Sequence, residues 1–409
     1  FEKLGERFNC HYRRINGLGT LSPYKVTMRI LISAESFLPR SNGVTNSVLH
    51  AARYLHNQGH IVRIIAPGIG PDSVDGVEIT RVPALALHSF AQVDIPSIST
   101  RTVMNLIRDF SPDIIHLASP FLLGEQVRKC AVMYDIPVVA NFQTDVSGFI
   151  NFYRLTTAKN LVERRLKKIH AGSTITLAPS TDSENYLKGL GIENIHRWGR
   201  GVDLKQFHPK WRSKTLRKSW GADSQTCVIG FVGRLAPEKQ VHKLANLSDI
   251  GELTGKKVVQ VIVGDGPSRA MLEKALPSAI FLGHQSGEAL SKAMASMDLL
   301  VTTGENETFC QVIQEAMAAG LPVIAPEIGG PRDLITPGHN GLFYTPGDDF
   351  HIRKRVLTLV NFEDMRLEMG RNAFATVQTR TWSAVCSELF TLYTEVLATR
   401  KDKQQGHAS

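Results

Sequence analysis

Cysteine is scarce in this sequence, and the few cysteines follow no pattern. They are odd in number and widely spaced, with no C-x2-C pair among them. A disulfide-stapled scaffold and a zinc finger are therefore excluded, because both need paired cysteines at close spacing. We interpret the cysteines as reduced thiols of a cytoplasmic protein. They are Cys10, Cys130, Cys227, Cys310 and Cys386.

Long hydrophobic runs are also missing. No stretch of 18 apolar residues occurs, so we expect no transmembrane helix. Residues 1–27 lack the apolar core of a signal peptide, and we expect an N-terminal extension there, because the first strand pattern begins at Met28. No solenoid-length repeat, coiled-coil heptad or low-complexity segment is present. A chain of 409 residues with this ordinary soluble composition is expected to form two domains.

The charge is unbalanced toward basic residues. The chain has 47 Lys and Arg against 38 Asp and Glu, a net charge of +9, which favours acidic partners such as nucleotide phosphates, anionic lipid or nucleic acid. We predict no nucleic-acid partner, because aromatic and basic residues are not interleaved and no nucleic-acid motif occurs. Residues 160–172 predict a basic helix that is either an ordinary solvated face or a patch attracted to anionic membrane lipid. Its clustered cations are Arg164, Arg165, Lys167 and Lys168.

Strand and helix patterns alternate along the chain from Met28 onward. An apolar strand pattern, a helical pattern over residues 48–59 and two further strand patterns open the sequence. This order predicts an α/β fold with a Rossmann-like half over residues 28–197, whose ligands bind at the carboxyl ends of its strands. A second such half is predicted over residues 198–380, followed by an amphipathic helix at about 381–399.

The stretch over residues 304–330 combines a polar loop, a helical pattern and a buried strand pattern. Thr308 suits the N-cap of the helix, and Gly320 suits the left-handed position that closes it. A helix start has unpaired N–H groups and attracts phosphate. Glu307 precedes this start and Glu315 lies about two turns inside. The two carboxylates are either solvated surface charges or acceptors for the hydroxyls of a phosphorylated sugar.

Loops that follow strand patterns in the first half contain further candidates. Gly43, after Asn42, is either a plain turn glycine or a point where the backbone approaches a ligand closely. His116 lies near the mouth of another predicted strand. Asp145 follows the strand pattern that starts near residue 136, and it either caps a turn or accepts a hydrogen bond from a sugar hydroxyl.

The second half opens with a buried strand pattern that ends at Gly233. Arg234 and Lys239 follow in a loop that enters a helix. Two cations at the carboxyl end of a strand are suited to bind a diphosphate. Arg can donate two hydrogen bonds to a phosphate, and Lys attracts it as a point charge. Gly264 lies in a later GDGP turn, and His284 follows the next strand pattern.

Taken together, these segments resemble the GT4 family of retaining glycosyltransferases. That family has the GT-B fold, in which two Rossmann-like domains face each other across a cleft. The resemblance covers residues 28–399 and is closest to actinobacterial GDP-mannose-dependent α-mannosyltransferases that act on glycolipids. It rests on ESFLPRSNGVTNSV, HLASP, HRWGRGVD, FVGRLAPEK, VGDG, GENETFCQVIQEA and GLPVIAPEIGGPRDLI.

The resemblance implies a role for each half. Residues 28–197 would form the acceptor domain, with the final helix packing back on it, and residues 198–380 the donor-nucleotide domain. Arg234 and Lys239 would bind the diphosphate, with Glu307 near the donor sugar and Glu315 on the ribose. The other implied nucleotide contacts are Asn42, Gly43, Gly264, His284 and the backbone N–H groups of Phe309 and Cys310. Asp145 would lie near the acceptor.

The resemblance also implies a reaction, the transfer of mannose from GDP-mannose to a glycolipid or lipid-linked acceptor as an α-mannoside. The sequence has no convincing nucleophile, so we favour attack on the same face guided by the leaving phosphate. No DxD-type motif stands in a donor loop, so we predict no metal and no cofactor. The alternatives are transfer from another donor such as UDP-glucose, or a sugar-nucleotide epimerase. We expect a cytoplasmic enzyme, peripheral at the inner face of the plasma membrane.

Overall fold

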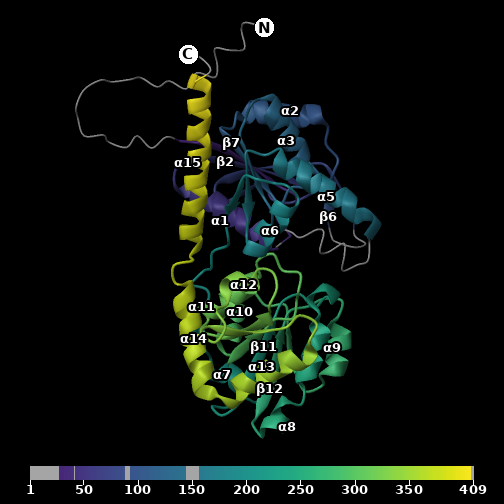
Figure 1. Cartoon of the computed structure of the whole chain (residues 1–409), viewed down its shortest axis with the longest axis vertical. Coiled ribbons are helices and arrows are strands. Elements are labelled where there is room, and N and C mark those ends of the chain that lie inside the picture. Colours follow the sequence, from purple (N-terminus) through teal and green to yellow (C-terminus); the bar gives the residue numbers. More distant parts are fainter. Residues whose placement is uncertain (1–26, 41, 88–92, 144–155, 407–409) are drawn as a thin grey trace, which may run out of the picture.

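The computed structural model describes residues 27–40, 42–87, 93–143 and 156–406. Two α/β halves follow one another along the longest axis of the molecule (Figure 1). The N-half contains strands β1 to β10 and the C-half contains strands β11 to β16. Each half is built on its own mainly parallel sheet, which confirms the predicted α/β class with two Rossmann-like parts. The predicted extension at residues 1–27 lies almost entirely outside the described residues.

The N-half sheet has eight strands in the order β10-β9-β8-β7-β1-β2-β4-β3. Every pair is parallel except β3 with β4. A separate antiparallel pair is formed by β5 and β6. The strands are β1 (Arg29–Ala34), β2 (Ile61–Pro67), β3 (Ser73–Val74), β4 (Val77–Val82), β5 (Ala84–Leu87), β6 (Val93–Pro96), β7 (Ile114–Ala118), β8 (Val138–Asn141), β9 (Ile175–Ala178) and β10 (Ile195–Arg197).

Helices cover both faces of the N-half sheet, which is why its strands read as continuous apolar runs. In β1, Ile30 and Ile32 face α1 and α15, whereas Leu31 packs with α2 and α3. Asn42 caps α1, because its side-chain oxygen accepts from the backbone N–H groups of Val44 and Thr45. The helices are α1 (Gly43–Asn57), α2 (Thr100–Phe110), α3 (Leu123–Met133), α5 (Thr156–Ala171) and α6 (Thr181–Gly189).

The C-half sheet has six parallel strands in the order β13-β12-β11-β14-β15-β16. Its two faces are covered by two separate hydrophobic clusters. The strands are β11 (Cys227–Val232), β12 (Val258–Val263), β13 (Ile280–Gly283), β14 (Leu299–Val301), β15 (Val323–Pro326) and β16 (Gly341–Tyr344). The helical segments are η2 (Pro209–Trp211), α7 (Lys214–Ser219), η3 (Pro237–Lys239), η4 (Val241–Leu247), α8 (Ile250–Thr254), α9 (Arg269–Ala275), α10 (Gly287–Ala295), α11 (Gln311–Ala318), α12 (Pro331–Leu334), α13 (Asp349–Asn361) and α14 (Glu363–Val377).

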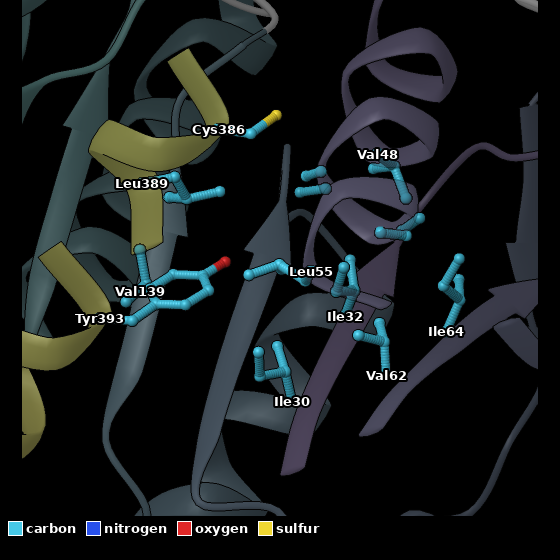
Figure 2. Close-up of a cluster of buried hydrophobic side chains, with 14 of the residues drawn as sticks. Ile30, Ile32, Val48, Leu55, Val62, Ile64, Val139, Cys386, Leu389 and Tyr393 are labelled. Carbon is cyan, nitrogen blue, oxygen red and sulfur yellow. The ribbon is translucent and has the colours of Figure 1, made fainter. Parts of the chain in front are cut away.

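The last helix, α15 (Trp382–Gly406), leaves the C-half and runs along one side of the N-half (Figure 1). Its buried residues Cys386, Leu389 and Tyr393 join the cluster of β1 and α1 (Figure 2). The Tyr393 hydroxyl also lies 2.7 Å from Nδ1 of His116 on β7. Since His116 is buried in this contact, it does not lie at the mouth of its strand as the sequence suggested.

Two aspartates, one from each half, hold the halves together. Asp333 at the start of the C-half helix α12 accepts hydrogen bonds of 2.6 Å from both the backbone N–H and the hydroxyl of Thr181. In return, Asp182 of α6 accepts a 2.6 Å hydrogen bond from the backbone N–H of Gly329. Burial would raise the pKa of Asp333, but the bonds from Thr181 and Arg197 hold it below its usual value.

Candidate active site

A pocket of about 170 Å³ lies between the two halves. Its N-half wall comes from the end of β8 and from α6, and its C-half wall from the loop after β14 and the loop before α12. Both walls therefore come from loops that follow parallel strands, where α/β proteins bind ligands. The lining residues are Phe142, Ser180, Asp182, Ser183, Tyr186, Glu305, Asn306, Glu307, Thr308, Ile328 and Gly329.

An ion pair joins two of the predicted site residues at this pocket. The ammonium of Lys239, at the end of η3, pairs with the carboxylate of Glu307. Burial alone would lower the pKa of Lys239, but the adjacent Glu307 raises it above its usual value. A parallel pair joins Lys243 to Glu305 at 2.6 Å. The two glutamates of the GENE segment are thus fixed by two lysines of the η3–η4 region.

The turn before α11 differs from the sequence expectation. We predicted Thr308 as the N-cap, but α11 begins at Gln311 and the residue before it, Cys310, has left-handed backbone with φ of 66°. No side chain caps the helix. Thr308 instead donates from its hydroxyl to the backbone oxygen of Gln143 in the N-half, at 2.9 Å. The other end of the helix agrees with the prediction, because Gly320 has φ of 82°.

The backbone at Phe309 is held by the glycines of the EIGG segment. A side chain at Gly330 would place its Cβ 2.3 Å from the Cα of Phe309. The backbone N–H of Gly330 donates to the oxygen of Glu307 at 2.8 Å, and Gly329 has φ of 68°. Both glycines are therefore needed for this close backbone packing. The packing positions the carboxylate of Glu307 and the start of α11.

Arg200 is buried in the same region, and the partly buried Glu315 lies within reach of its charge. Burial raises the pKa of Glu315 to about 8, although the charge of Arg200 opposes this rise. Burial likewise lowers the pKa of Arg200 to about 10, while Glu307, Glu315 and Cys310 act in the opposite direction. The Arg200 guanidinium carbon lies 5.9 Å from the centre of the Phe309 ring. Glu315 thus faces a buried cation from the segment that links the halves.

Arg200 also reaches the first loop of the N-half. Its Nη2 lies 3.4 Å from Oε1 of Gln143. A Cβ built on Gly43 would lie 2.3 Å from Nη1 of Arg200, so only glycine leaves room for this guanidinium. Neighbouring Asn42 uses its side chain as the cap of α1 and donates to the Ser36 hydroxyl at 2.9 Å. The structure therefore brings Gly43 and Asn42 to the junction with the C-half.

The other predicted site residues of the C-half lie in the loops after β11, β12 and β13. Arg234 is 58% exposed and pairs with Glu238 at 3.4 Å. Gly264 packs against the same loop, since a Cβ there would lie 1.9 Å from the backbone oxygen of Gly233. His284 is exposed in the loop after β13, and Asp145 lies outside the described residues. The GDGP turn therefore supports the loop that carries Arg234.

Sequence reasoning had left three residues of this junction out of the site. Gln143 and Thr308 form a contact between the halves, and Arg200 lies beside both Gly43 and Phe309. In the sequence, Arg200 was one residue of the HRWGRGVD segment, which we had interpreted as a link between domains. Its burial depends on both halves folding against the link, so the local pattern did not indicate it.

The raised pKa of Glu315 predicts a specific pH dependence of stability. The folded state holds this proton up to about pH 8, whereas the ordinary value is 4.5. The folded state therefore binds more protons in this window, and stability falls as the pH rises, by at most about 1.4 kcal/mol per pH unit. We expect Glu315→Gln to lack this loss, so its stability advantage over the unsubstituted protein grows from about pH 5 to about pH 8.

Urea unfolding of both proteins across this range measures the effect. Glu288→Gln, at an exposed glutamate of α10, is the matched control and should follow the unsubstituted protein. If Glu315→Gln also ran parallel to it, Glu315 would not be held in its neutral form.

Two family descriptions match the chain, one in each half. The family described as Glycosyltransferase Family 4 matches residues 41–206, and the one described as Glycosyl transferases group 1 matches residues 212–376. The two matches together include every described strand except β1, and they include the segment that carries Arg200.

Known proteins resemble the chain over nearly its whole length. It is 41% identical to a GDP-mannose-dependent alpha-mannosyltransferase of Mycobacterium tuberculosis, over 91% of this chain and 98% of that protein. It is 43% identical to the Corynebacterium glutamicum protein of the same description, over 91% and 90% of the two chains. The structure of sucrose-phosphate synthase from Thermosynechococcus elongatus superposes with a TM-score of 0.74 at 17% identity, covering 90% of this chain and 99% of that one.

These relatives confirm the resemblance that the motifs suggested, and the fold is the GT-B arrangement of two Rossmann-like domains. The chain belongs to the glycosyltransferase family that contains the actinobacterial GDP-mannose-dependent alpha-mannosyltransferases.

Proposed function

We propose that this protein transfers mannose from GDP-mannose to a glycolipid or lipid-linked acceptor, forming an α-mannoside. The observation that carries the proposal is the 41–43% identity to GDP-mannose-dependent alpha-mannosyltransferases over 91% of the chain. A basic residue, Lys239, beside the uncapped start of α11 supports it, because both features favour a phosphorylated donor.

In this proposal the cations act on the leaving group. The bond between the sugar C1 and the outer phosphate oxygen breaks, and its electron pair passes to that phosphate. The acceptor oxygen bonds to C1 from the same face, and its proton passes to the departing phosphate. Arg234, Lys239 and the N–H groups of Phe309 and Cys310 would stabilise the negative charge that develops on the diphosphate. No metal ion or cofactor enters this scheme.

The carboxylates would orient the donor. Glu307, held by Lys239, lies at the interdomain pocket and would contact the sugar. Glu315 would accept a ribose hydroxyl, as its place on the helix that starts at this loop allows. Asn42, Gly43 and Asp145 would contribute from the acceptor side, and the loops of Gly264 and His284 from the nucleotide side.

A lipid acceptor requires contact with a membrane surface, and helix α5 is the proposed contact. Leu161 is 71% exposed, and Arg164, Lys167 and Lys168 are exposed on the same helix. Arg165 is engaged elsewhere, because it donates to the backbone oxygen of Phe121 at 2.8 Å. None of the described helices is long and apolar enough to cross a membrane. We propose a cytoplasmic protein bound at the inner face through cations and one apolar side chain.

Loss of both loop cations should abolish most of the transfer. Removing one contact that stabilises the leaving group costs about 10²–10³-fold in turnover. We therefore expect Arg234→Ala with Lys239→Ala to lower the GDP released from GDP-mannose by at least about 10³-fold. The matched control replaces Lys257 and Lys274, exposed lysines of the C-half, and should keep full activity. Unimpaired transfer by the first variant would contradict the diphosphate assignment.

Transfer should continue without a divalent metal, since protein cations would meet the phosphate charge. The measurement is product formation from GDP-mannose after treatment with EDTA and gel filtration, with UDP-glucose as the comparison donor. Activity that disappeared with EDTA and returned with Mg²⁺ or Mn²⁺ would overturn this expectation.

Binding to anionic vesicles should depend on the charges of α5. We expect Arg164→Glu with Lys167→Glu to lower sedimentation with phosphatidylglycerol-containing liposomes, since each basic residue near the surface contributes about 1 kcal/mol. Lys257→Glu with Lys274→Glu makes the same charge change in the C-half and should sediment normally. Equal loss in both variants would mean that net charge, rather than α5, decides the binding.

A further inference from the structure

Arg200 is a buried cation on the segment that links the two halves. Only 9% of the residue is exposed. Val202, two residues later, donates its backbone N–H to the oxygen of Arg380, and a Cβ on Gly201 would lie 2.4 Å from the backbone of Trp382. The backbone next to Arg200 is thus held against the start of α15. This anchorage fixes where the guanidinium enters the junction between the halves.

The guanidinium is poorly satisfied for a buried group. In the described part of the chain its one hydrogen bond is the 3.4 Å contact with Gln143, and its Nε has no partner. The Nε2 of Gln143, which is 6% exposed, also lacks a partner. Buried donors of this kind are costly when unpaired, so they mark a place where a ligand oxygen is missing.

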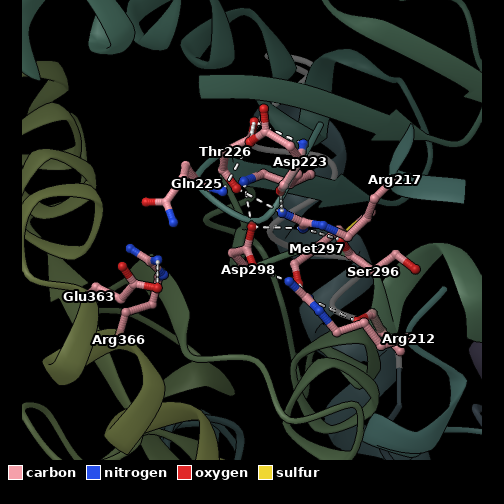
Figure 3. Close-up of polar contacts among 12 residues, drawn as sticks. Arg212, Arg217, Asp223, Gln225, Thr226, Ser296, Met297, Asp298, Glu363 and Arg366 are labelled. Atoms are coloured by element: carbon pink, nitrogen blue, oxygen red, sulfur yellow. Dashed lines mark hydrogen bonds and ion pairs between the residues drawn. The ribbon is translucent and has the colours of Figure 1, made fainter. Parts of the chain in front are cut away.

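Arg217 is a buried arginine with a structural role, and its partners can be compared with those of Arg200. It is 6% exposed and donates to Asp298 Oδ2 at 2.9 Å. It also donates to the backbone oxygens of Ser296, Asp223 and Thr226 at 2.8 to 3.0 Å (Figure 3). Arg217 therefore has a carboxylate and three carbonyls, whereas Arg200 forms no ion pair among the described residues.

The guanidinium of Arg200 lies against the start of helix α1. Its Nη1 lies 2.3 Å from where a Cβ of Gly43 would be, at the first residue of the 15-residue helix α1. The first-turn N–H groups of Val44 and Thr45 already donate to the side chain of Asn42, so the start of α1 does not itself offer an anion site. The nearby carboxylates form no ion pair with Arg200 among the described residues, because Glu307 is paired with Lys239 and Glu315 acts on the guanidinium only through its charge.

We propose that Arg200 and the side-chain amide of Gln143 bind a phosphate of the sugar nucleotide from the N-half side. This rests on the proposed function. The donor is favoured over an anionic acceptor, because Arg200 also faces Phe309 and Cys310, the segment adjoining the Lys239–Glu307 pair. Phosphate oxygens match the fork of a guanidinium better than a single ammonium. The bound diphosphate would then connect the linker, the loop after β8 and the C-half loop.

The test uses Arg200→Met, which keeps the apolar stem and removes the charge. GDP and guanosine are titrated by calorimetry, since guanosine has the same base and ribose without phosphates. We expect GDP to bind about 10- to 100-fold more weakly, as for loss of a hydrogen bond between charged groups, and guanosine to bind as before. The melting temperature without ligand should stay equal or rise, because an unpaired buried charge has been removed.

The matched control is Arg217→Met, which should lower the melting temperature and, below it, leave GDP affinity unchanged. Gly43→Ala is a second, independent variant. Its Cβ would displace the guanidinium, so GDP affinity should fall while guanosine affinity does not.

The outcomes separate this proposal from the proposed function. If the unsubstituted protein binds no GDP, the proposed function itself fails. If it binds GDP and Arg200→Met binds it equally well, the Arg200 assignment is wrong. Unchanged GDP affinity with a raised acceptor KM would place the anion on the acceptor and overturn the donor assignment. A lower melting temperature with unchanged GDP affinity would make Arg200 a structural residue.

Discussion

Parallel strands impose the constraint on which this structure depends, because all strands of such a sheet end at one edge. The loops after β8 in the N-half and after β14 in the C-half line one interdomain pocket. Residues that are far apart in sequence, such as Gln143 and Thr308, are therefore in contact across the junction. Most polar groups proposed for donor binding lie in such loops or beside them, whereas Glu315 lies inside α11.

Charge is distributed unevenly along this junction. The carboxylates of Glu305 and Glu307 are each neutralised by a lysine of the C-half. Asp182 and Asp333 accept hydrogen bonds from the opposite half. Arg200 forms no ion pair among the described residues, and its Nε has no hydrogen-bond partner. These acidic side chains are thus paired with other groups of the protein. This leaves a positive electrostatic potential for an anionic substrate.

The glycines of this region serve packing more than flexibility. Gly43 leaves room for a guanidinium, and Gly330 allows the backbone of Phe309 to approach. Gly264 lets one loop support the loop of Arg234. For Gly43 and Gly264 the sequence suggested a contact with the nucleotide, and the structure shows a protein group beside each of them. The glycines of these motifs therefore position the protein groups that are proposed to bind the ligand.

The sequence by itself determined the α/β class, the two Rossmann-like halves, and the left-handed close of α11 at Gly320, because hydrophobic period and glycine chemistry are local properties. It also indicated the family, through long motifs that few other folds would carry. Only the tertiary structure decided that Thr308 contacts the N-half instead of capping α11, and that Arg200 is buried without an ion pair among the described residues. Both depend on groups more than fifty residues away in the chain, so no local pattern could reveal them.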